Sequence, residues 1–448
     1  MAAAPVRVIS MATPAVTTVE HSRAERALEF LSLYGTLAVL VFGPLAFGAV
    51  EPWSVFILEI SSAALLLAWT AKQIVAGRIH IQWSPVFAPM LFFAVVIACQ
   101  LLFGSTAYRY ATTAQSLRYV MYGTLCFVAL QALDSPGAQT RFARVLSWSG
   151  FALAVFALIQ GLSSNGKLYW LRTPTFGGSI YGPYVNHNHY AGLMEMLTPL
   201  PLMLCLSGKF GGAQKFLLAF ASLIMAATIF TSGSRGGMVA FACEAVLFAA
   251  LVYTKNKSVT TILTAATFAL LLGSIVAWLG WSTVAARWHE VRVTHGVELS
   301  ISSRLAIDKD ALHMFAAHPL LGWGLGNFPT AYPQFRSFFT DMYVNAAHND
   351  YLQMLVETGA FGGAAMIWFV ILVFRAGIRQ TWLPHRRGFG GGGNQMFMNP
   401  LATAALIGCA GLLVHSLVDF NLQIPANAAL FYVLASVACA HVNAPELD

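Results

Sequence analysis

Residues 347–374 read AHNDYLQMLVETGAFGGAAMIWFVILVF, a short polar group followed by a long apolar run. Such a run is long enough to cross the hydrocarbon core of a bilayer as an α-helix, and comparable runs recur from one end of the chain to the other. The 448 residues are 58% hydrophobic and only 10% charged, whereas soluble domains carry about 25% charged residues. Because helices satisfy their own backbone hydrogen bonds in lipid, the sequence predicts an all-α, polytopic membrane protein.

Twelve apolar segments are candidates for membrane-spanning helices. They cover residues 30–50, 54–71, 85–103, 117–133, 145–163, 189–207, 215–232, 237–254, 259–281, 350–374, 399–419 and 427–443. The first 28 residues carry several charges and no apolar core. A cleavable secretory signal is therefore not expected, and the first helix would itself direct insertion.

The distribution of basic residues predicts the orientation of these helices. With the N-terminus in the cytoplasm, fifteen of the 25 lysines and arginines fall on the cytoplasmic side and ten on the other side. Five of those ten lie in one long loop, to which the rule does not apply. The predicted organisation is a cytoplasmic tail (1–29), helices one to nine (30–281), a large and partly helical external loop (282–347), and helices ten to twelve with a short cytoplasmic C-terminus (348–448).

Arg235 lies in the stretch FTSGSRGGMVAF (residues 230–241), which joins two apolar segments on the external side. One interpretation is an arginine that anchors a helix end by reaching toward the headgroups. However, Ser234 and the neighbouring glycines let backbone N–H groups approach a ligand closely. The external face also needs no positive charge for topology, so the pattern favours an anion site.

Arg304 lies in ISSRLAIDKDALHMF (residues 301–315), within the long external loop. Arg304 and Asp308 are four residues apart, which is typical of an ordinary helical ion pair. If Ser302 or Ser303 caps this helix, Arg304 falls in the first turn, where the helix dipole disfavours a cation. An anion bound by both the arginine and the helix terminus would explain that position.

His348 lies in the polar group that precedes the apolar run of residues 350–374. Asp350 with Gln353 resembles a capping box, and Asn349 is a rival cap. Neither explains His348, which would lie at the positive end of a membrane helix, where the dipole keeps the imidazole neutral. A neutral imidazole can accept a proton from an attacking hydroxyl. The alternative is a structural histidine that is hydrogen-bonded at an interface.

Two further polar groups lie at external helix ends. In YGPYVNHNHYAGLMEM (residues 181–196), Asn186, Asn188 and His189 favour capping by Asn188 with sugar or phosphate contacts. Metal binding is less favoured there because a third ligand is missing. His415 and Asp419 are four apart near the end of the eleventh segment, which indicates a buried pair that orients a site, or a proton relay.

Four of these motifs, in this order, resemble the O-antigen ligase and polymerase superfamily, and most of all an O-antigen ligase. They are the Ser234-Arg235-Gly236 turn, Arg304, HPLLGWGLGNF (residues 318–328) and HNDYLQMLVETG (residues 348–359). The resemblance implies a glycosyltransferase-C-like membrane fold in the bacterial inner membrane, with the external loop and the active site on the periplasmic side. It implies a metal-independent, inverting transfer of a glycan from undecaprenyl pyrophosphate to lipid A–core, in lipopolysaccharide biosynthesis.

The same resemblance assigns roles to residues. Arg235 and Arg304 would bind the donor pyrophosphate, and His348 would activate the acceptor hydroxyl. Supporting or substrate-contacting residues would be Asn186, Asn188, His189, Ser234, Asn349, Glu357, His415 and Asp419. No metal, cofactor or nucleic acid is expected, and the partners are the two lipid-linked glycans and membrane lipids.

Two alternatives remain open at this point. A polymerase would use a second lipid-linked repeat as acceptor and would need a second basic site, for which the candidates are Arg109, Arg118, Lys167 and Arg172. A transporter of lipid-linked glycans would need charged residues along a passage. The acidic candidates are Glu59, Glu195, Glu244, Glu357 and Asp419, and no basic residue lies in the middle of a segment.

Overall fold

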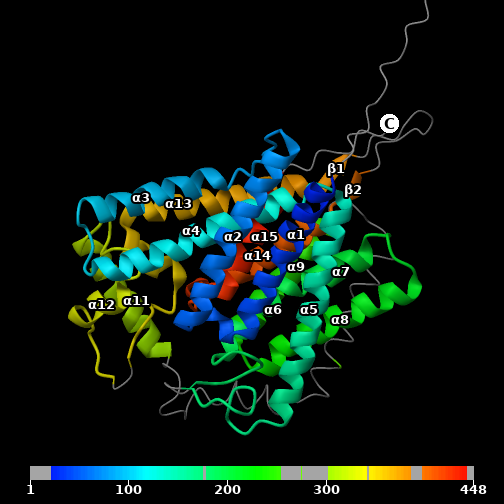
Figure 1. Ribbon diagram of the computed structural model, residues 1–448. Helices are drawn as coiled ribbons and strands as arrows, with labels where there is room; N and C mark the ends of the chain where they lie inside the picture. Colours follow the sequence, from blue (N-terminus) through cyan, green and yellow to red (C-terminus); the bar gives the residue numbers. More distant parts are fainter. Residues whose placement is uncertain are drawn as a thin grey trace, which may run out of the picture.

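The structure, a computed structural model, is dominated by helices, among which α3, α4 and α13 lie side by side and α5 runs steeply across their direction (Figure 1). It describes residues 22–174, 178–253, 274, 301–340, 343–384 and 396–440. The helices of the first half are α1 (Arg23–Leu45), η1 (Phe47–Ala49), α2 (Pro52–Ala76), α3 (Phe87–Leu102), α4 (Arg109–Ala132), α5 (Pro136–Leu162), α6 (His187–Leu197), α7 (Pro199–Leu206), α8 (Gly212–Ser232) and α9 (Arg235–Tyr253). The second half contains α11 (Ile301–Ala317), α12 (Phe328–Ala331), η3 (Tyr332–Gln334), α13 (Asp350–Thr381), α14 (Pro400–His415), η4 (Asn421–Gln423) and α15 (Pro425–Cys439).

Two three-residue strands, which the sequence analysis did not predict, follow α13. β1 (Trp382–Pro384) pairs antiparallel with β2 (Met396–Met398), with Leu383 opposite Phe397. The pair lies at the end of the molecule where α13 stops (Figure 1). Apart from this small hairpin, the described residues confirm the predicted all-helical class.

Each predicted apolar segment inside the described residues coincides with a helix, and the sixth is divided into α6 and α7. The division falls at Pro199, whose missing N–H and fixed φ favour the start of a new helix. The ninth segment, residues 259–281, lies outside the described residues except for Ser274. Five of the described helices, α1, α2, α5, α8 and α13, are long and apolar enough to cross a membrane. The number of twelve spans stays a prediction.

Helix α1 begins at Arg23, several residues before the first predicted segment. Ser22 is its N-cap, and the Ser22 hydroxyl accepts a hydrogen bond from the Glu25 N–H at 3.1 Å. Serine followed three residues later by glutamate is a capping-box sequence. The helix therefore starts at a local polar signal, upstream of the apolar run.

Helices α14 and α15 form the centre of the bundle, with α6 beside them (Figure 1). Nearly all residues of these three helices are buried. Small residues permit this close packing. A Cβ atom on Gly408 of α14, for example, would lie 2.8 Å from the Cα of Met196 in α6.

The outer helices expose large apolar side chains instead. Phe56, Ile60 and Leu67 of α2 are 60%, 55% and 71% exposed, and Phe216 of α8 is 70% exposed. Exposed apolar surface of this extent is expected on a face that meets lipid. The exposure of large apolar side chains on the outer helices agrees with the apolar composition of the chain.

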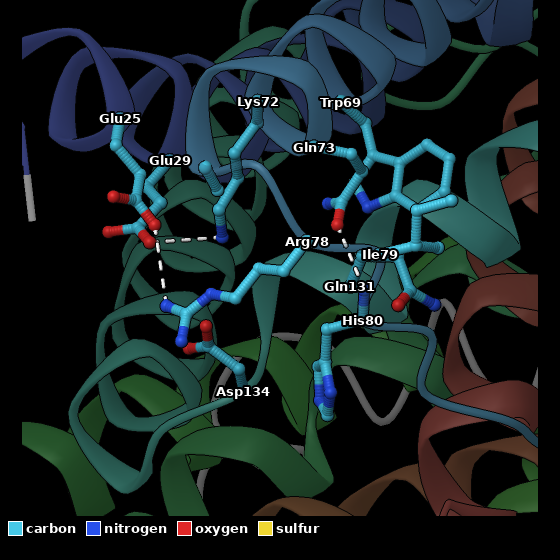
Figure 2. A pocket seen from close by; sticks show the side chains of 11 residues that line it. Glu25, Glu29, Trp69, Lys72, Gln73, Arg78, Ile79, His80, Gln131 and Asp134 are labelled. Atoms are coloured by element: carbon cyan, nitrogen blue, oxygen red, sulfur yellow. Dashed lines mark hydrogen bonds and ion pairs between the residues drawn. The ribbon is translucent and has the colours of Figure 1, made fainter. Parts of the chain in front are cut away.

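Ion pairs hold α1 and α2 together at the end of the bundle where α1 starts (Figure 2). Lys72 contacts Glu29 at 2.9 Å, and Arg78 contacts Glu25 at 3.6 Å. They line a cavity of about 360 Å³ that also contains Asp134, whose pKa is raised because burial disfavours its charged form. In the predicted orientation this charged end is the cytoplasmic one.

The glycine-rich motif of residues 318–328 docks against a break in α13. Gly359 has φ +65° and ψ −164°, a conformation that belongs almost entirely to glycine. The backbone N–H groups of Trp323 and Gly324 donate to the carbonyls of Val356 and Glu357, each at 3.0 Å. The Glu357 carboxylate accepts from the N–H groups of Gly326 at 2.8 Å and Phe328 at 3.1 Å. Glu357 therefore holds this loop in place.

Candidate functional site

The turn that follows α14, residues 416–420, is the point on which the candidate residues converge. Helix α14 stops at His415, where the sequence analysis extended the apolar segment to residue 419. His415 and Asp419 consequently do not share a helical face, so the helical spacing expected for this pair is wrong. Both side chains are buried and their charges act on each other, but no hydrogen bond joins them among the described residues. His415 contacts a different carboxylate, that of Glu195 in α6, at 2.8 Å.

His348 faces this turn from the start of α13. Its Nδ1 atom lies 3.9 Å from Oδ1 of Asp419, and its ring meets the Phe420 ring edge-on with centroids 4.8 Å apart. The His348 side chain is 14% exposed. Its backbone has φ +54°, which is uncommon for a residue other than glycine, and such strained positions cluster at active sites.

The cap of α13 is Asn349, whose side-chain oxygen accepts from the N–H groups of Tyr351 and Leu352, each at 3.2 Å. The sequence offered Asn349 and Asp350 as caps, and the prediction of Asp350 as the N-cap is therefore wrong. The buried Asp350 carboxylate accepts instead from the Ser416 hydroxyl and the Leu422 N–H, each at 2.9 Å. Asp350 thereby ties the turn after α14 to the helix that begins beside His348.

Arg304 reaches the same turn from α11. Its Nη1 atom donates to the Val418 carbonyl at 2.8 Å, one residue before Asp419. Its Nε–H is buried and has no hydrogen-bond partner within the described residues. No Arg304–Asp308 ion pair is present among the described residues, so the ordinary helical pair is wrong. Burial raises the pKa of the Asp308 carboxyl, with the Arg304 charge acting in the opposite direction.

The predicted caps of α11 are also wrong. The helix begins at Ile301, upstream of both Ser302 and Ser303, so neither serine is an N-cap. Arg304 is the fourth residue of α11 within the described part of the chain, which resumes at Ile301. The electrostatic argument for an anion at this helix end therefore keeps its basis.

Arg235 is the first residue of α9, on a turn that packs against the same segment. Ser234 precedes it, and the Ser234 hydroxyl accepts from the Gly237 N–H at 3.1 Å, as an N-cap does. A Cβ atom on Gly236 would lie 2.7 Å from the His415 ring and 3.0 Å from a methyl of Val418. Within the described residues, Arg235 has no carboxylate within ion-pair distance.

The Asn-His-Asn-His stretch contributes one ring to the site. Asn186 caps α6 by accepting from the Asn188 N–H at 2.8 Å, so the expected cap at Asn188 is wrong. Asn188 lies in the first turn and is buried. His189 meets the Phe420 ring edge-on at 4.6 Å, and Phe420 therefore lies between the rings of His189 and His348.

Asp419 is the negative charge of this cluster. It lies in the turn beyond α14 and is buried, and its Oδ1 atom accepts from the Phe420 N–H at 2.8 Å. Burial by itself would raise the pKa of Asp419, but His189, the other nearby histidines and Arg304 outweigh it, and the pKa is lowered. The carboxylate therefore stays ionised opposite His348.

An apolar groove leads away from the site through the bundle. It has a volume of about 640 Å³ and is lined by α3, α4, α13 and α15. Most of its lining is apolar, but Asp350 and Gln423 lie at the end near the candidate site. Trp83 lies at the other end, beyond the start of α3.

Sequence reasoning did not identify Phe420, Ser416 or the Glu195–His415 contact. The stretch SLVDFNLQIP (residues 416–425) carries the signal that was missed. Polar residues at alternating positions end the apolar run, and Pro425 is typical of the first turn of a new helix. Glu195 gave no signal for a partner, because a long-range contact between two helices leaves no trace in local spacing.

These contacts describe a protein of apolar helices in which Arg304, His348 and Asp419 meet at one turn and the Arg235 turn packs against the same segment. Residues 220–367 of the chain match the family model described as O-Antigen ligase. The matched segment contains Ser234, Arg235, Arg304 and His348, and it ends before Asp419. The match covers residues 220–367 of the 448, and over this segment it confirms the resemblance predicted from the motifs. No curated protein matches the sequence.

Proposed function

We propose that this protein is an O-antigen ligase: a metal-independent, inverting glycosyltransferase that moves a glycan from undecaprenyl pyrophosphate to a sugar hydroxyl of lipid A–core. The observation that carries the proposal is the approach of three elements to the turn after α14. These are the Arg235 turn, the first turn of α11 with Arg304, and His348. The matched family segment supports the same reaction class.

The arginines are suited to a pyrophosphate. Neither has a carboxylate at ion-pair distance among the described residues, and each lies in the first turn of a helix. A guanidinium binds phosphate oxygens through two parallel hydrogen bonds, and helix N-termini attract anions. In the proposed reaction, Arg235 and Arg304 bind the donor and stabilise the charge that develops on the leaving pyrophosphate.

His348 is suited to act as the base. Its Nδ1 atom faces the ionised Asp419, which stabilises the imidazolium that forms when the ring takes a proton. In the proposed step, the acceptor oxygen forms a bond to the anomeric carbon while the bond from that carbon to the pyrophosphate oxygen breaks. The electron pair leaves with the pyrophosphate, and the hydroxyl proton goes to His348. One displacement inverts the anomeric centre.

The apolar groove is the proposed path of the donor lipid. A polyprenyl chain needs an apolar surface that extends from the lipid to the reacting centre, and the groove between α3, α4, α13 and α15 ends at Asp350 and Gln423. The Asp350 carboxylate accepts a hydrogen bond from the Ser416 hydroxyl, in the turn that carries Asp419. The proposed site is thus on the periplasmic side of the bacterial inner membrane, in keeping with a role in lipopolysaccharide maturation.

A polymerase that uses a second lipid-linked repeat is the second candidate. One of the four basic residues considered for its second donor site, Arg172, is already paired with a carboxylate. It forms an ion pair with Glu51 at 2.6 Å and lies over the Phe47 ring at 4.6 Å. This favours the ligase.

A transporter is the third candidate, and the buried carboxylates weigh against it. Glu195 contacts His415 at 2.8 Å, and Glu357 accepts two backbone N–H groups of the glycine-rich loop. These side chains therefore have structural partners within the described residues. A passage for a charged substrate would need polar groups that face it.

The test is reconstitution of the purified protein with a lipid-linked glycan and two acceptors, lipid A–core and a second lipid-linked repeat. The ligase proposal predicts that the glycan appears on lipid A–core with inverted anomeric configuration, in the presence of EDTA. Elongated lipid-linked glycan as the only product would establish the polymerase instead. Loss of activity in EDTA that a divalent cation restores would overturn metal independence.

A further inference from the structure

Three side chains beneath the Arg235 turn form a buried chain that the reaction above does not use. Nδ1 of His415 contacts Oε1 of Glu195 at 2.8 Å, and Nε2 of His415 lies 3.5 Å from the Ser234 hydroxyl. Each of the three side chains is at most 1% exposed. They come from α6, α14 and the start of α9, three elements that are far apart in the sequence.

The order serine, histidine, carboxylate is that of a nucleophilic triad, and the geometry argues against that role here. The Ser234 oxygen already accepts the Gly237 N–H at 3.1 Å, because it is the N-cap of α9. It is also completely buried, so an incoming sugar cannot reach it. The distance of 3.5 Å is at the limit of a hydrogen bond, whereas the histidine–carboxylate contact is short.

The His415 ring instead supports the backbone of the turn. A Cβ atom on Gly236 would lie 2.7 Å from two atoms of this ring, and one on Gly237 would lie 3.1 Å from Oε1 of Glu195. The glycine backbone therefore rests directly on the histidine and the carboxylate. Because Glu195 fixes the orientation of the ring, it also fixes the position of the residue that precedes Gly236, which is Arg235.

We propose that Glu195 and His415 are positioning residues that hold the Ser234–Gly237 turn at the place where Arg235 meets the donor pyrophosphate. The identity of the anion as a pyrophosphate rests on the proposed function. The effect of Glu195 and His415 on the position of the turn does not, and it can be measured separately. Removing the charge of Glu195 should loosen the turn and weaken donor binding without removing the catalytic base.

The test uses Glu195→Gln in the full-length protein, with Glu244→Gln as the matched control. Glu244 is also a buried carboxylate, but it lies in α9 against Gly411 and does not contact the turn. Hydrogen–deuterium exchange should become faster at residues 234–238 in Glu195→Gln and stay at the wild-type rate in Glu244→Gln. The KM for the lipid-linked donor should rise about tenfold in Glu195→Gln, with kcat at saturating donor changed by less than about twofold.

Gly236→Ala provides a second route that keeps Glu195, because the added methyl displaces the His415 ring. It should give the same faster exchange and the same rise in donor KM. Unchanged exchange and unchanged donor KM in both folded variants would overturn the positioning role, and so would an equal effect of Glu244→Gln. Complete loss of kcat in Ser234→Ala, with retained anomeric configuration in the wild-type product, would overturn it in favour of a nucleophilic triad.

The two proposals can fail separately. If the turn loosens as expected but the wild-type protein transfers no glycan, the positioning role stands and the proposed function fails. If the wild-type protein transfers glycan and neither variant alters the turn or the donor KM, the positioning role fails and the proposed function stands.

Discussion

At the scale of single residues, the account depends on where two positive charges and one negative charge lie. Arg235 and Arg304 have no carboxylate at ion-pair distance in the part of the chain that the structure describes, while Asp419 faces His348 at 3.9 Å. Cations at a helix terminus that form no direct ion pair with a carboxylate are expected where an anionic ligand binds. A carboxylate opposite a histidine is expected where the imidazole must become positive during a reaction.

The first prediction concerns the arginines. Arg235→Ala and Arg304→Ala should each weaken the binding of a lipid-linked pyrophosphate donor by about 10- to 100-fold, since each removes a charge-assisted hydrogen bond of about 1.5–3 kcal/mol. Binding of the detergent-solubilised protein to the donor measures this. Arg172→Ala is the matched control, because Arg172 is paired with Glu51, and its donor affinity should equal that of the wild type. Wild-type donor affinity in Arg235→Ala and Arg304→Ala, as in the control, would disprove the pyrophosphate role.

The second prediction concerns pH. The lowered pKa of Asp419 keeps this group ionised through neutral pH, so the acidic limb of the pH–rate profile should report protonation of the base and not of Asp419. Asp419→Asn removes a negative charge that favours the protonated base. The acidic limb should therefore move to lower pH, together with a lower maximal rate. A limb that stays in place would mean that Asp419 does not act on the base.

At the scale of elements, the glycine-rich loop and the break in α13 form one unit. Gly359 has a glycine-only conformation, and a Cβ atom there would lie 2.3 Å from the backbone of Leu320. Both the dihedral angles of Gly359 and its close approach to the Leu320 backbone exclude a side chain at this position. The loop of residues 318–328 is thus built onto the helix that begins beside His348.

The third prediction follows from this unit. Gly359→Ala should destabilise the protein by an amount on the order of 1–3 kcal/mol or more, because backbone strain and a backbone clash act together. A lower Tm in thermal unfolding measures the loss. Gly212→Ala is the control, since a Cβ atom at Gly212 meets nothing within 4 Å. If the two variants have the same Tm, the close docking of the loop on α13 is incorrect.

The elements could largely be predicted from the sequence, but their ends could not. Apolar runs located every helix whose segment is described, because apolar length is set locally. The start of α1 at Ser22 and the end of α14 at His415 depend on polar residues that the apolar pattern does not weigh. The error at α14 led to the wrong expectation that His415 and Asp419 share a helical face, since a four-residue spacing has meaning only inside a helix.

At the scale of the whole molecule, the site exists because packing brings α6, α9, α11, α13 and the turn after α14 together. His189, His348 and Phe420 are more than 70 residues apart from one another in the sequence, yet their rings are in contact. Single motifs predicted the arginines and the histidine one at a time. The partners Asp419 for His348 and Glu195 for His415 depend on tertiary contacts, which one sequence does not contain.

The fourth prediction tests the groove as the path of the lipid. Ala98 of α3 lines it, and Ala98→Trp should fill part of the 640 Å³ volume. The KM of a donor with a full-length polyprenyl chain should rise several-fold, whereas a donor with a short prenyl chain should be affected much less. Steady-state kinetics with the two donors measure the difference. The same rise for both donors would mean that the lipid chain does not lie in this groove.

The central claim is that His348 removes the proton of the acceptor hydroxyl at a site that needs no metal. Its most direct test is the rate of glycan transfer by purified His348→Ala and wild-type protein, measured at saturating lipid-linked donor with EDTA present. The account predicts wild-type turnover under these conditions, and a rate for His348→Ala that is lower by about 10²- to 10⁴-fold with unchanged donor affinity. A His348→Ala protein that transfers glycan at the wild-type rate would contradict the account.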